Sequence, residues 1–411
     1  MVPIASRPTC DIDVLDPTFY QDPHPEYRWL RANRPVCWDE RHELWVLSRH
    51  ADISYVSTHP ELFCSGRGIR PTQSVDLSLV GLDGERHLRQ RRLINQGFSP
   101  RMIRAMEPRV RQVVAEVLDR VAERSSCDFV ADIAVPVPLV VIAELMGLPV
   151  EDRVQLGHWS DRMMGGEGRG DPEDPHLLDA AAAFGEYVGY LSGIVEDRRQ
   201  AYRRGGSLPD DVISVLVGAD EEGVLESNDE LTHDELTMFL VVLLVAGNET
   251  TRNAISGGMW ALRQFPDQWG RLAEDPGVLP TMADEICRFV SPVISFARTT
   301  TEATELGGQQ IAEGEKVLLL YQSANRDEDV FIDPGELHLD RKPNPHLAFG
   351  VGPHVCMGIN LARLEIRVLF EELVRRFPDM AVAPGATARY GEHALVHAIE
   401  SLPVEYTPSS A

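Results

Sequence analysis

The longest helical pattern in the sequence begins at Thr232 and continues to about Leu262. The segment Thr232-His233-Asp234-Glu235 has the spacing of a capping box, which satisfies the free backbone N–H groups of a first helical turn. An almost unbroken apolar run follows, and a helix of about 30 residues is roughly 45 Å long. The sequence therefore predicts a buried central helix that crosses the whole molecule.

The middle of this predicted helix breaks its own pattern. From Ala246 to Thr251 the sequence reads Ala-Gly-Asn-Glu-Thr-Thr, so Gly247 and the carboxylate of Glu249 fall within an apolar stretch. A glycine costs a helix about 1 kcal/mol relative to alanine, and a buried carboxylate needs a partner. Either this segment serves a function, or the helix ends with Gly247 as its C-cap and the polar residues form a loop.

Composition and charge exclude several classes of protein. The 411 residues are 43% hydrophobic and 25% charged, and a net charge of −25 argues against nucleic-acid binding, which needs positive charge. No apolar stretch approaches the roughly 18 residues of a membrane span, and the first residues lack the form of a secretory signal. We therefore expect no membrane anchor. The six cysteines are scattered without a CxxC pair, which suits a reducing compartment, so we expect a cytoplasmic protein.

The rest of the chain is predominantly helical. Apolar residues recur three and four apart from Val110 to Val121 and again from Leu361 to Leu373. A β-hairpin is expected where Val36-Cys37-Trp38 and Leu44-Trp45-Val46-Leu47 flank a polar turn. Since no linker is evident, we expect a single domain over residues 1–411, mainly α with small β-sheets (α+β).

The strongest local motif is Phe349-Gly-Val-Gly-Pro-His-Val-Cys-Met-Gly358, followed by a helical pattern. Its first two glycines allow a tight turn close to a flat ligand. Cys356 lies just before a helix, where backbone N–H groups and the helix dipole favour a thiolate. Such a thiolate can be the axial ligand of a haem iron, with Phe349 shielding the sulfur from water. The alternative for a single cysteine is an inert buried thiol.

With this motif and the central helix, the chain resembles a cytochrome P-450 of the soluble bacterial kind over essentially its whole length. The resemblance implies the P-450 fold, with haem b between the central helix and the cysteine loop, Cys356 as the iron ligand and O2 as co-substrate. The segments Gly68-Ile-Arg-Pro71, Leu320-Tyr-Gln-Ser-Ala-Asn325 and His346-Leu-Ala-Phe-Gly350 are similar to those of actinobacterial members that hydroxylate sterol side chains.

The resemblance also implies a buried ion network built on a Glu-x-x-Arg motif. That motif occurs four times, starting at Glu196, Glu249, Glu285 and Glu372. Only Glu285, with Arg288, has the position that the family requires, and the other three are expected to be ordinary surface salt bridges. Arg341 of a following loop should complete the network, although Leu337 stands where the family usually has an aromatic residue.

Further residues take roles that the resemblance implies. The haem propionates should be bound by His87, Arg91, Arg298 and His354. Ala246 and Gly247 should face the haem and leave room for O2, and Gly358 should lie beside it. Glu249 and Thr250 should form the acid–alcohol pair that relays protons to bound oxygen, as general acid catalysis requires. Glu249 is one methylene longer than the commoner Asp, which can change the geometry of the relay.

The expected substrate pocket is apolar. By their positions, the resemblance implies that Val242, Val245, Val293, Ile294, Phe296 and Leu395 line it, and their apolar side chains suit an apolar substrate. We therefore expect hydroxylation of an apolar small molecule, with a preference for a steroid or sterol. The alternative is the tailoring of a polyketide, terpenoid or other secondary metabolite.

A basic segment predicts the redox partner. From Arg86 to Arg111 there are eight Arg and one Glu, in a chain of net charge −25. This face should attract an acidic iron–sulfur ferredoxin, itself reduced by a reductase, to the monomeric protein. Two further classes stay open: a haem-binding protein without turnover and a peroxide-driven haem enzyme. Neither needs Glu249 and Thr250.

Overall fold

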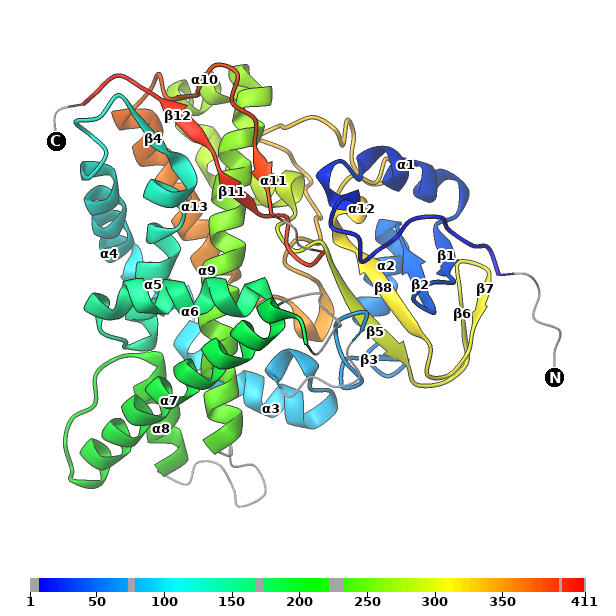
Figure 1. Ribbon diagram of the computed structural model, residues 1–411, viewed down its shortest axis with the longest axis horizontal. Helices are drawn as coiled ribbons and strands as arrows, with labels where there is room; N and C mark the ends of the chain where they lie inside the picture. Colours follow the sequence, from blue (N-terminus) through cyan, green and yellow to red (C-terminus); the bar gives the residue numbers. More distant parts are fainter. Residues whose placement is uncertain are drawn as a thin grey trace.

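Helices form the larger part of the structure, and the largest β-sheet lies to one side of them together with the N-terminal segment, whereas β4, β11 and β12 lie among the helices (Figure 1). The computed structural model describes residues 7–72, 78–98, 100–166, 173–221, 233–391 and 394–409. The helices are α1 (His24–Asn33), α2 (His50–Thr58), α3 (Gly84–Ile94), α4 (Pro100–Asp119), α5 (Pro136–Met146), α6 (Arg153–Gly165), α7 (Pro175–Arg203), α8 (Val212–Glu221), α9 (His233–Gln264), α10 (Pro266–Glu274), α11 (Leu279–Val290), α12 (Tyr321–Ala324) and α13 (Ile359–Arg376). The strands are β1 (Val36–Asp39), β2 (Leu44–Leu47), β3 (Phe63–Cys64), β4 (Ser126–Asp128), β5 (Ser295–Thr300), β6 (Thr304–Leu306), β7 (Gln309–Ile311), β8 (Lys316–Leu320), β9 (Ala381–Val382), β10 (Arg389–Tyr390), β11 (Ile399–Ser401) and β12 (Pro403–Glu405). The expected mainly α fold with small sheets is confirmed.

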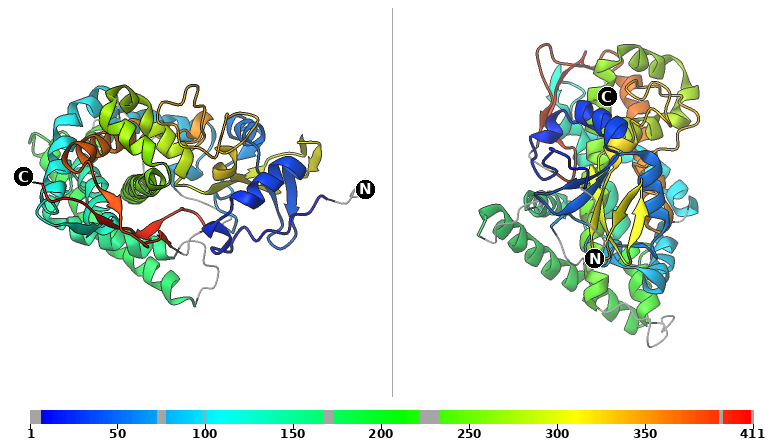
Figure 2. Two further views of the ribbon diagram at one scale, coloured as in Figure 1. Left: turned by 90° about the horizontal axis from the view of Figure 1, so that it is seen from above. Right: turned by 90° about the vertical axis from the view of Figure 1, so that its right-hand side faces the viewer.

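The central element is α9, which has 32 residues and runs through the helical part of the molecule. Helices α5, α6, α7, α11 and α13 all contact it, and Figure 2 shows it end-on with other helices around it. The helix continues unbroken past Gly247, so the alternative of a C-cap there is wrong. Thr232, the predicted cap, lies outside the described residues. Among the described helices, none is long and apolar enough to cross a membrane.

Two glycines bring α9 and α11 together. A Cβ atom placed on Gly257 would lie 2.5 Å from Cγ1 of Val290, and one on Gly258 would lie 2.9 Å from Cγ2 of Ile286. Larger residues at these positions would push the helices apart, because a packed interior has no room for additional methyl groups. The close approach fixes α11, which carries Glu285, against the central helix.

A five-stranded sheet with the order β1-β2-β8-β5-β3 supports the other side of the molecule. The predicted hairpin is confirmed, with Val36 paired to Leu47. Side chains alternate between the two faces of a strand, so Leu319 packs with residues of α2 whereas Leu318 packs with α1 and the N-terminal segment. Strand β5 pairs with β8 and carries Arg298 near its end.

The ion network joins α11 to the long segment that follows α12. Glu285 and Arg288 are both fully buried, and two hydrogen bonds of 2.7 and 2.8 Å connect them. Arg341 donates to the same carboxylate from Nε at 3.0 and 3.1 Å. Arg288 also donates to the backbone oxygens of Asn325, Pro334 and Glu336. The structure therefore brings the three predicted residues together.

The loop of this network keeps its place without the usual aromatic residue. Leu337 is 1% exposed and belongs to the main hydrophobic core, so an aliphatic side chain fills the position. The neighbouring backbone N–H of His338 donates to Glu285 at 2.9 Å.

We predict that Glu285→Ala lowers the free energy of unfolding by about 3–5 kcal/mol, because it leaves two buried guanidinium groups without their anion. Denaturant unfolding of the purified protein measures this loss. Glu372→Ala is the control, because Glu372 pairs with Arg375, whose side chain is 67% exposed. The control should lose less than about 1 kcal/mol. Equal losses in the two variants would contradict the structural role of the network.

Candidate functional site

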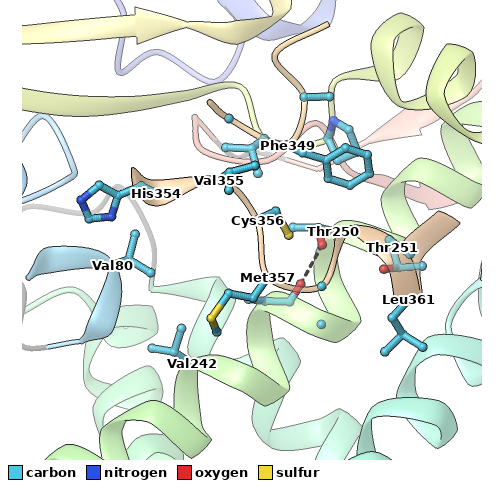
Figure 3. Close-up of a pocket in the computed structure, with 18 of the residues that line it drawn as sticks. Val80, Val242, Thr250, Thr251, Phe349, His354, Val355, Cys356, Met357 and Leu361 are labelled. Carbon is cyan, nitrogen blue, oxygen red and sulfur yellow. Dashed lines mark hydrogen bonds between the residues drawn. The ribbon is translucent and has the colours of Figure 1, made fainter. Parts of the chain in front are cut away.

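A large cavity lies between α9 and the loop that precedes α13 (Figure 3). It contains about 1570 Å³ of space that no atom fills, part of it continuous with solvent. Most of its wall is apolar, and residues from α3, α5, α9, α11, β5 and α13 contribute to it. Cys356, Thr250, Phe349 and His354 all line this cavity.

The cysteine loop owes its shape to two glycines with left-handed backbone angles. Gly350 has φ of 66° and Gly352 has φ of 77°. A Cβ atom on Gly352 would also lie 2.4 Å from the backbone oxygen of Ser57, so only glycine fits here. The backbone N–H of Cys356 donates to the oxygen of Phe349 at 2.8 Å and closes the loop. The loop thus points Cys356 into the cavity, three residues before α13 begins.

The environment of Cys356 differs from the sequence prediction. Desolvation by the surrounding protein raises the pKa of its thiol, although the side chain is exposed to the open cavity, while the backbone N–H groups of Gly358 and Ile359 and the charge of Arg91 act in the opposite direction. The predicted effect of the helix start is therefore present but weaker than desolvation. A metal ion deprotonates a coordinating thiol outright, so a bound iron would reverse this balance.

Four basic side chains gather at one side of the cavity. His87, Arg91, Arg298 and His354 all line it, as predicted. The rings of His87 and His354 stack with 4.1 Å between centroids, and Arg91 donates a hydrogen bond to the backbone oxygen of Val355. Burial, aided by nearby arginines, lowers the pKa of His87 to about 4 and that of His354 to about 2.

This group of side chains fits the carboxylates of a haem. Nε2 of His87 is buried and has no hydrogen-bond partner among the described residues. Arg298 is 4% exposed and has no ion-pair partner in the described part of the chain. Arg298 donates to the backbone oxygen of Ala297 at 2.7 Å, but a buried cation without a counter-ion and a buried ring nitrogen without a partner are costly unless a ligand completes the site. Together with the thiol of Cys356 across an apolar cavity, they form the set that a haem requires.

The wall opposite the cysteine loop comes from the middle of α9, around Gly247. Ala246, Gly247 and Thr250 line the cavity, and the hydroxyl of Thr250 donates to the backbone oxygen of Ala246 at 2.7 Å. A Cβ atom on Gly247 would lie 2.8 Å from two atoms of Ile142 on α5. The missing side chain therefore also lets α5 approach α9, in addition to the room for oxygen that the resemblance implies.

Glu249 does not line the cavity. Successive helical residues point about 100° apart, so Glu249 faces α6 while Thr250 faces the cavity. Its Oε1 accepts from Ser160 at 3.1 Å, and its Oε2 lies 2.6 Å from Arg252. Burial raises the pKa of Glu249 to about 7, although Arg252 opposes this shift.

The Glu-x-x-Arg motif at Glu249 was expected to be a surface salt bridge, and this expectation is wrong. Glu249 is 2% exposed because α6 covers it. Arg252 in turn pairs at 2.7 Å with Asp161, whose side chain is 59% exposed. The chain of contacts from Glu249 through Arg252 to Asp161 thus connects the centre of α9 to the surface. Sequence spacing could have indicated Arg252, but nothing in the sequence placed Ser160 and Asp161 beside it.

Only part of the predicted substrate lining faces the cavity. Val242, Val293 and Phe296 line it. Ile294, just before β5, does not, because it packs into the core with residues of α1. Val245 and Leu395 pack instead in a small separate cluster with Met164 and Val396. Aromatic and aliphatic residues that sequence reasoning missed complete the wall, namely Leu79, Phe98, Ile142, Phe239 and Leu243.

Comparison with known proteins identifies the family. The family model described as Cytochrome P450 matches residues 277–386. A steroid C26-monooxygenase of Mycolicibacterium smegmatis is 37% identical over 414 residues, which cover 100% of this chain and 99% of the relative. A steroid C26-monooxygenase of Mycobacterium tuberculosis is 36% identical, over 97% of this chain and 98% of the relative.

Solved structures agree with these relatives. A Bacillus megaterium cytochrome P450 in complex with testosterone has a TM-score of 0.85 and 33% identity, over 95% of this chain and 99% of that chain. A Mycobacterium marinum cytochrome P450 in complex with pseudoionone has a TM-score of 0.87 and 32% identity, over 98% and 100% of the two chains. This chain therefore belongs to the cytochrome P450 family and is a P450 monooxygenase, an enzyme that uses haem and O2.

Proposed function

We propose that this P450 hydroxylates an apolar, steroid-like molecule at a haem whose iron is bound by Cys356. One observation carries the proposal: Cys356, the cluster of basic side chains and Thr250 line the same apolar cavity. When bound, haem supplies the iron at which O2 is activated. His87, Arg91, Arg298 and His354 would hold its propionates, and Phe349 would keep water from the sulfur.

Replacement of the cysteine tests this assignment. Purified protein should bind one haem, and its reduced carbonyl complex should show the red-shifted Soret band that thiolate ligation produces. Cys356→Ala should abolish that band because it removes the thiol that would bind the iron. Cys64→Ala is the matched control and should keep the band, since Cys64 is not among the residues that line the cavity. A Cys356→Ala variant that retains the band would show that another group is the ligand.

The preference for a steroid rests on the cavity and on the relatives. Leu79, Phe239, Val242, Val293 and Phe296 give the cavity an apolar wall, which suits a rigid hydrocarbon framework. Two relatives are named steroid C26-monooxygenases, and one solved neighbour holds testosterone. We expect steroids to shift the Soret band of the holoenzyme at lower concentrations than linear fatty acids or pseudoionone. Equal or weaker response to steroids would favour the alternative of a secondary-metabolite substrate.

Proton supply in this proposal uses two neighbouring residues with different surroundings. The hydroxyl of Thr250 faces the cavity and can donate a hydrogen bond there once it releases the oxygen of Ala246. Glu249 can hold a proton near neutral pH, since its pKa is raised to about 7. To deliver that proton, Glu249 has to leave Ser160 and Arg252 or act through water. Asp161 gives this acid a connection to solvent.

Two variants separate these roles. In Thr250→Ala, O2 and reductant should still be consumed, but hydrogen peroxide should replace most of the product. In Glu249→Gln, turnover should fall by about 10²-fold, because proton transfer by a positioned acid is typically worth that much. The parent rate should also decline as pH rises through about 7, where Glu249 loses its proton, and this decline should vanish in Glu249→Gln. Product per reducing equivalent, measured across pH, decides both roles. Unchanged coupling and unchanged rates would contradict the relay.

P450 monooxygenases take electrons from a redox partner, and we propose that an acidic ferredoxin fills this role here. The predicted basic segment is less basic than its sequence suggests. Arg86 pairs with Glu235, and Arg109 and Arg111 pair with several glutamates. Arg92, Arg101 and Arg104 are exposed and have no ion-pair partner among the described residues. Leu88 of α3 and Val355, whose backbone oxygen binds Arg91 of the same helix, are also exposed and would add apolar contact.

Charge reversal tests this docking face. Arg101→Glu with Arg104→Glu should slow reduction by ferredoxin at least tenfold while substrate binding stays unchanged, because complementary charge accelerates encounter. Raised ionic strength should slow reduction of the parent, since charges are screened over about 8 Å at physiological salt. The matched control is Arg120→Glu with Arg124→Glu, which makes the same change of charge beyond the far end of α4. Equal effects of the two double variants would exclude specific docking at this face.

A further inference from the structure

Asp284 comes immediately before Glu285 on α11, yet it faces a different part of the chain. Its Oδ1 accepts hydrogen bonds from Nε2 of His346 at 3.1 Å and from Nε of Arg363 at 2.8 Å. Successive helical residues point about 100° apart, so Glu285 binds the segment that approaches the cysteine loop, whereas Asp284 binds a residue just ahead of that loop and one on α13 behind it. The mechanism proposed above does not use this carboxylate.

The two partners of Asp284 both lie against the ring of Phe349. The ring centroids of His346 and Phe349 are 5.7 Å apart, and Cζ of Arg363 lies 5.6 Å from the centroid of the same Phe349 ring. An aromatic face attracts a cation at such a distance, which gives Arg363 a second attachment. Phe349 lines the cavity, and its backbone oxygen accepts from the N–H of Cys356 at 2.8 Å. Asp284 therefore holds the two side chains that border the residue expected to shield the sulfur.

The hydrogen bonds of this group fix its protonation and its geometry. Nδ1 of His346 accepts from the backbone N–H of Ala348 at 3.3 Å, so the ring proton lies on Nε2 and is donated to Asp284. The His346 side chain is 4% exposed, and its ring cannot turn without the loss of both bonds. Burial acts to raise the pKa of Asp284, but hydrogen bonds from His346 and Arg363 lower it below its ordinary value. Asp284 and Arg363 thus form an ion pair of fixed geometry.

The charges of this ion pair act on the cavity. Desolvation raises the pKa of the Cys356 thiol, and Arg91 and Arg363 both act against that shift. In the proposed function Arg91 would face a haem propionate, whereas Arg363 faces an anion of the protein itself. Burial raises the pKa of Cys287, which also lines the cavity; there Asp284 adds to the shift and Arg363 opposes it. The two members of the pair therefore exert opposite electrostatic effects at the site.

We propose that Asp284 is a positioning residue of the haem site: with His346 and Arg363 it fixes the ring of Phe349, and with Arg363 it sets the reduction potential of the iron bound at Cys356. Reduction adds one negative charge to the site, so a nearby cation favours the reduced form and a nearby anion opposes it. This inference rests on the proposed function, because the potential belongs to the haem at Cys356. The potential in turn decides how completely a redox partner reduces the protein.

Spectroelectrochemical titration of the substrate-free holoenzyme tests the electrostatic role. Asp284→Asn keeps the shape of the side chain but leaves the charge of Arg363 uncompensated. It should favour the reduced form at least threefold, or about 28 mV upward at 59 mV per tenfold. Arg363→Gln should shift the same equilibrium at least threefold in the opposite direction, and Asp284→Glu, which restores the anion, should lie within about twofold of the parent. Opposite signs separate charge from disturbed packing, which would move both variants in the same direction.

A matched ion pair at the other end of α13 provides the control. Arg376 pairs with Asp119 at 2.8 Å, and Arg376 lies about 20 Å along the helix from Arg363, beyond the roughly 8 Å over which charges act at physiological salt. Asp119→Asn and Arg376→Gln should leave the potential unchanged. Shifts of one sign in Asp284→Asn and Arg363→Gln, or equal shifts in the control variants, would overturn the electrostatic role.

The positioning role is tested without a change of charge. His346→Leu removes one of the side chains that hold the Phe349 ring, and water should then reach the sulfur. A hydrogen bond from water weakens the iron–sulfur bond, so the Fe–S stretching frequency in resonance Raman spectra should fall. An unchanged frequency would contradict this role. The failure of the proposed function would be visible separately, as a red-shifted Soret band that survives in Cys356→Ala.

Discussion

The buried carboxylate of Glu285 holds together parts of the chain that have little regular structure of their own. It accepts hydrogen bonds from Arg288 on its own helix and from Arg341, 53 residues further on. Arg288 in turn binds three backbone oxygens of the intervening segment. Since few helices or strands occur between α12 and α13, this network is what gives the approach to the cysteine loop a fixed path. The position of Cys356 depends on it.

The second constraint is the burial of α9 on nearly all sides. At the level of the cavity, two faces of α9 have different surroundings, because successive residues of a helix point about 100° apart. Thr250 and Ala246 face the cavity, whereas Glu249 faces α6 and joins an ion pair that leads to the surface. In the proposed function, these neighbouring residues would therefore divide two roles: Thr250 would form hydrogen bonds to the ligand, and Glu249 would hold a proton. The apolar surroundings that make the helix stable also raise the pKa of Glu249 into the neutral range.

Several features followed from the sequence because they rest on local rules. The central helix, the hairpin and the cysteine loop depend on periodicity, capping and glycine placement, and each is present in the structure. Pocket residues were harder to predict, since facing depends on packing. Ile294 packs into the core with residues of α1, and Val245 and Leu395 pack in another cluster, although all three are apolar residues close to residues that line the cavity. Glutamates of distant helices also form ion pairs with part of the basic segment, which reduces its free positive charge.

The sequence alone determined which residues could form a P450: the cysteine loop, the Glu-x-x-Arg at Glu285 and the irregular centre of the long helix. The spacing of these residues determines local backbone geometry, which does not depend on the distant elements that pack against them. Only the tertiary structure decided which carboxylates lie in apolar surroundings and what they contact. Glu249 contacts Ser160 of α6 and is connected through Arg252 to Asp161 of the same helix. Desolvation and pairing depend on which distant elements pack together, and these interactions raise the pKa of Glu249.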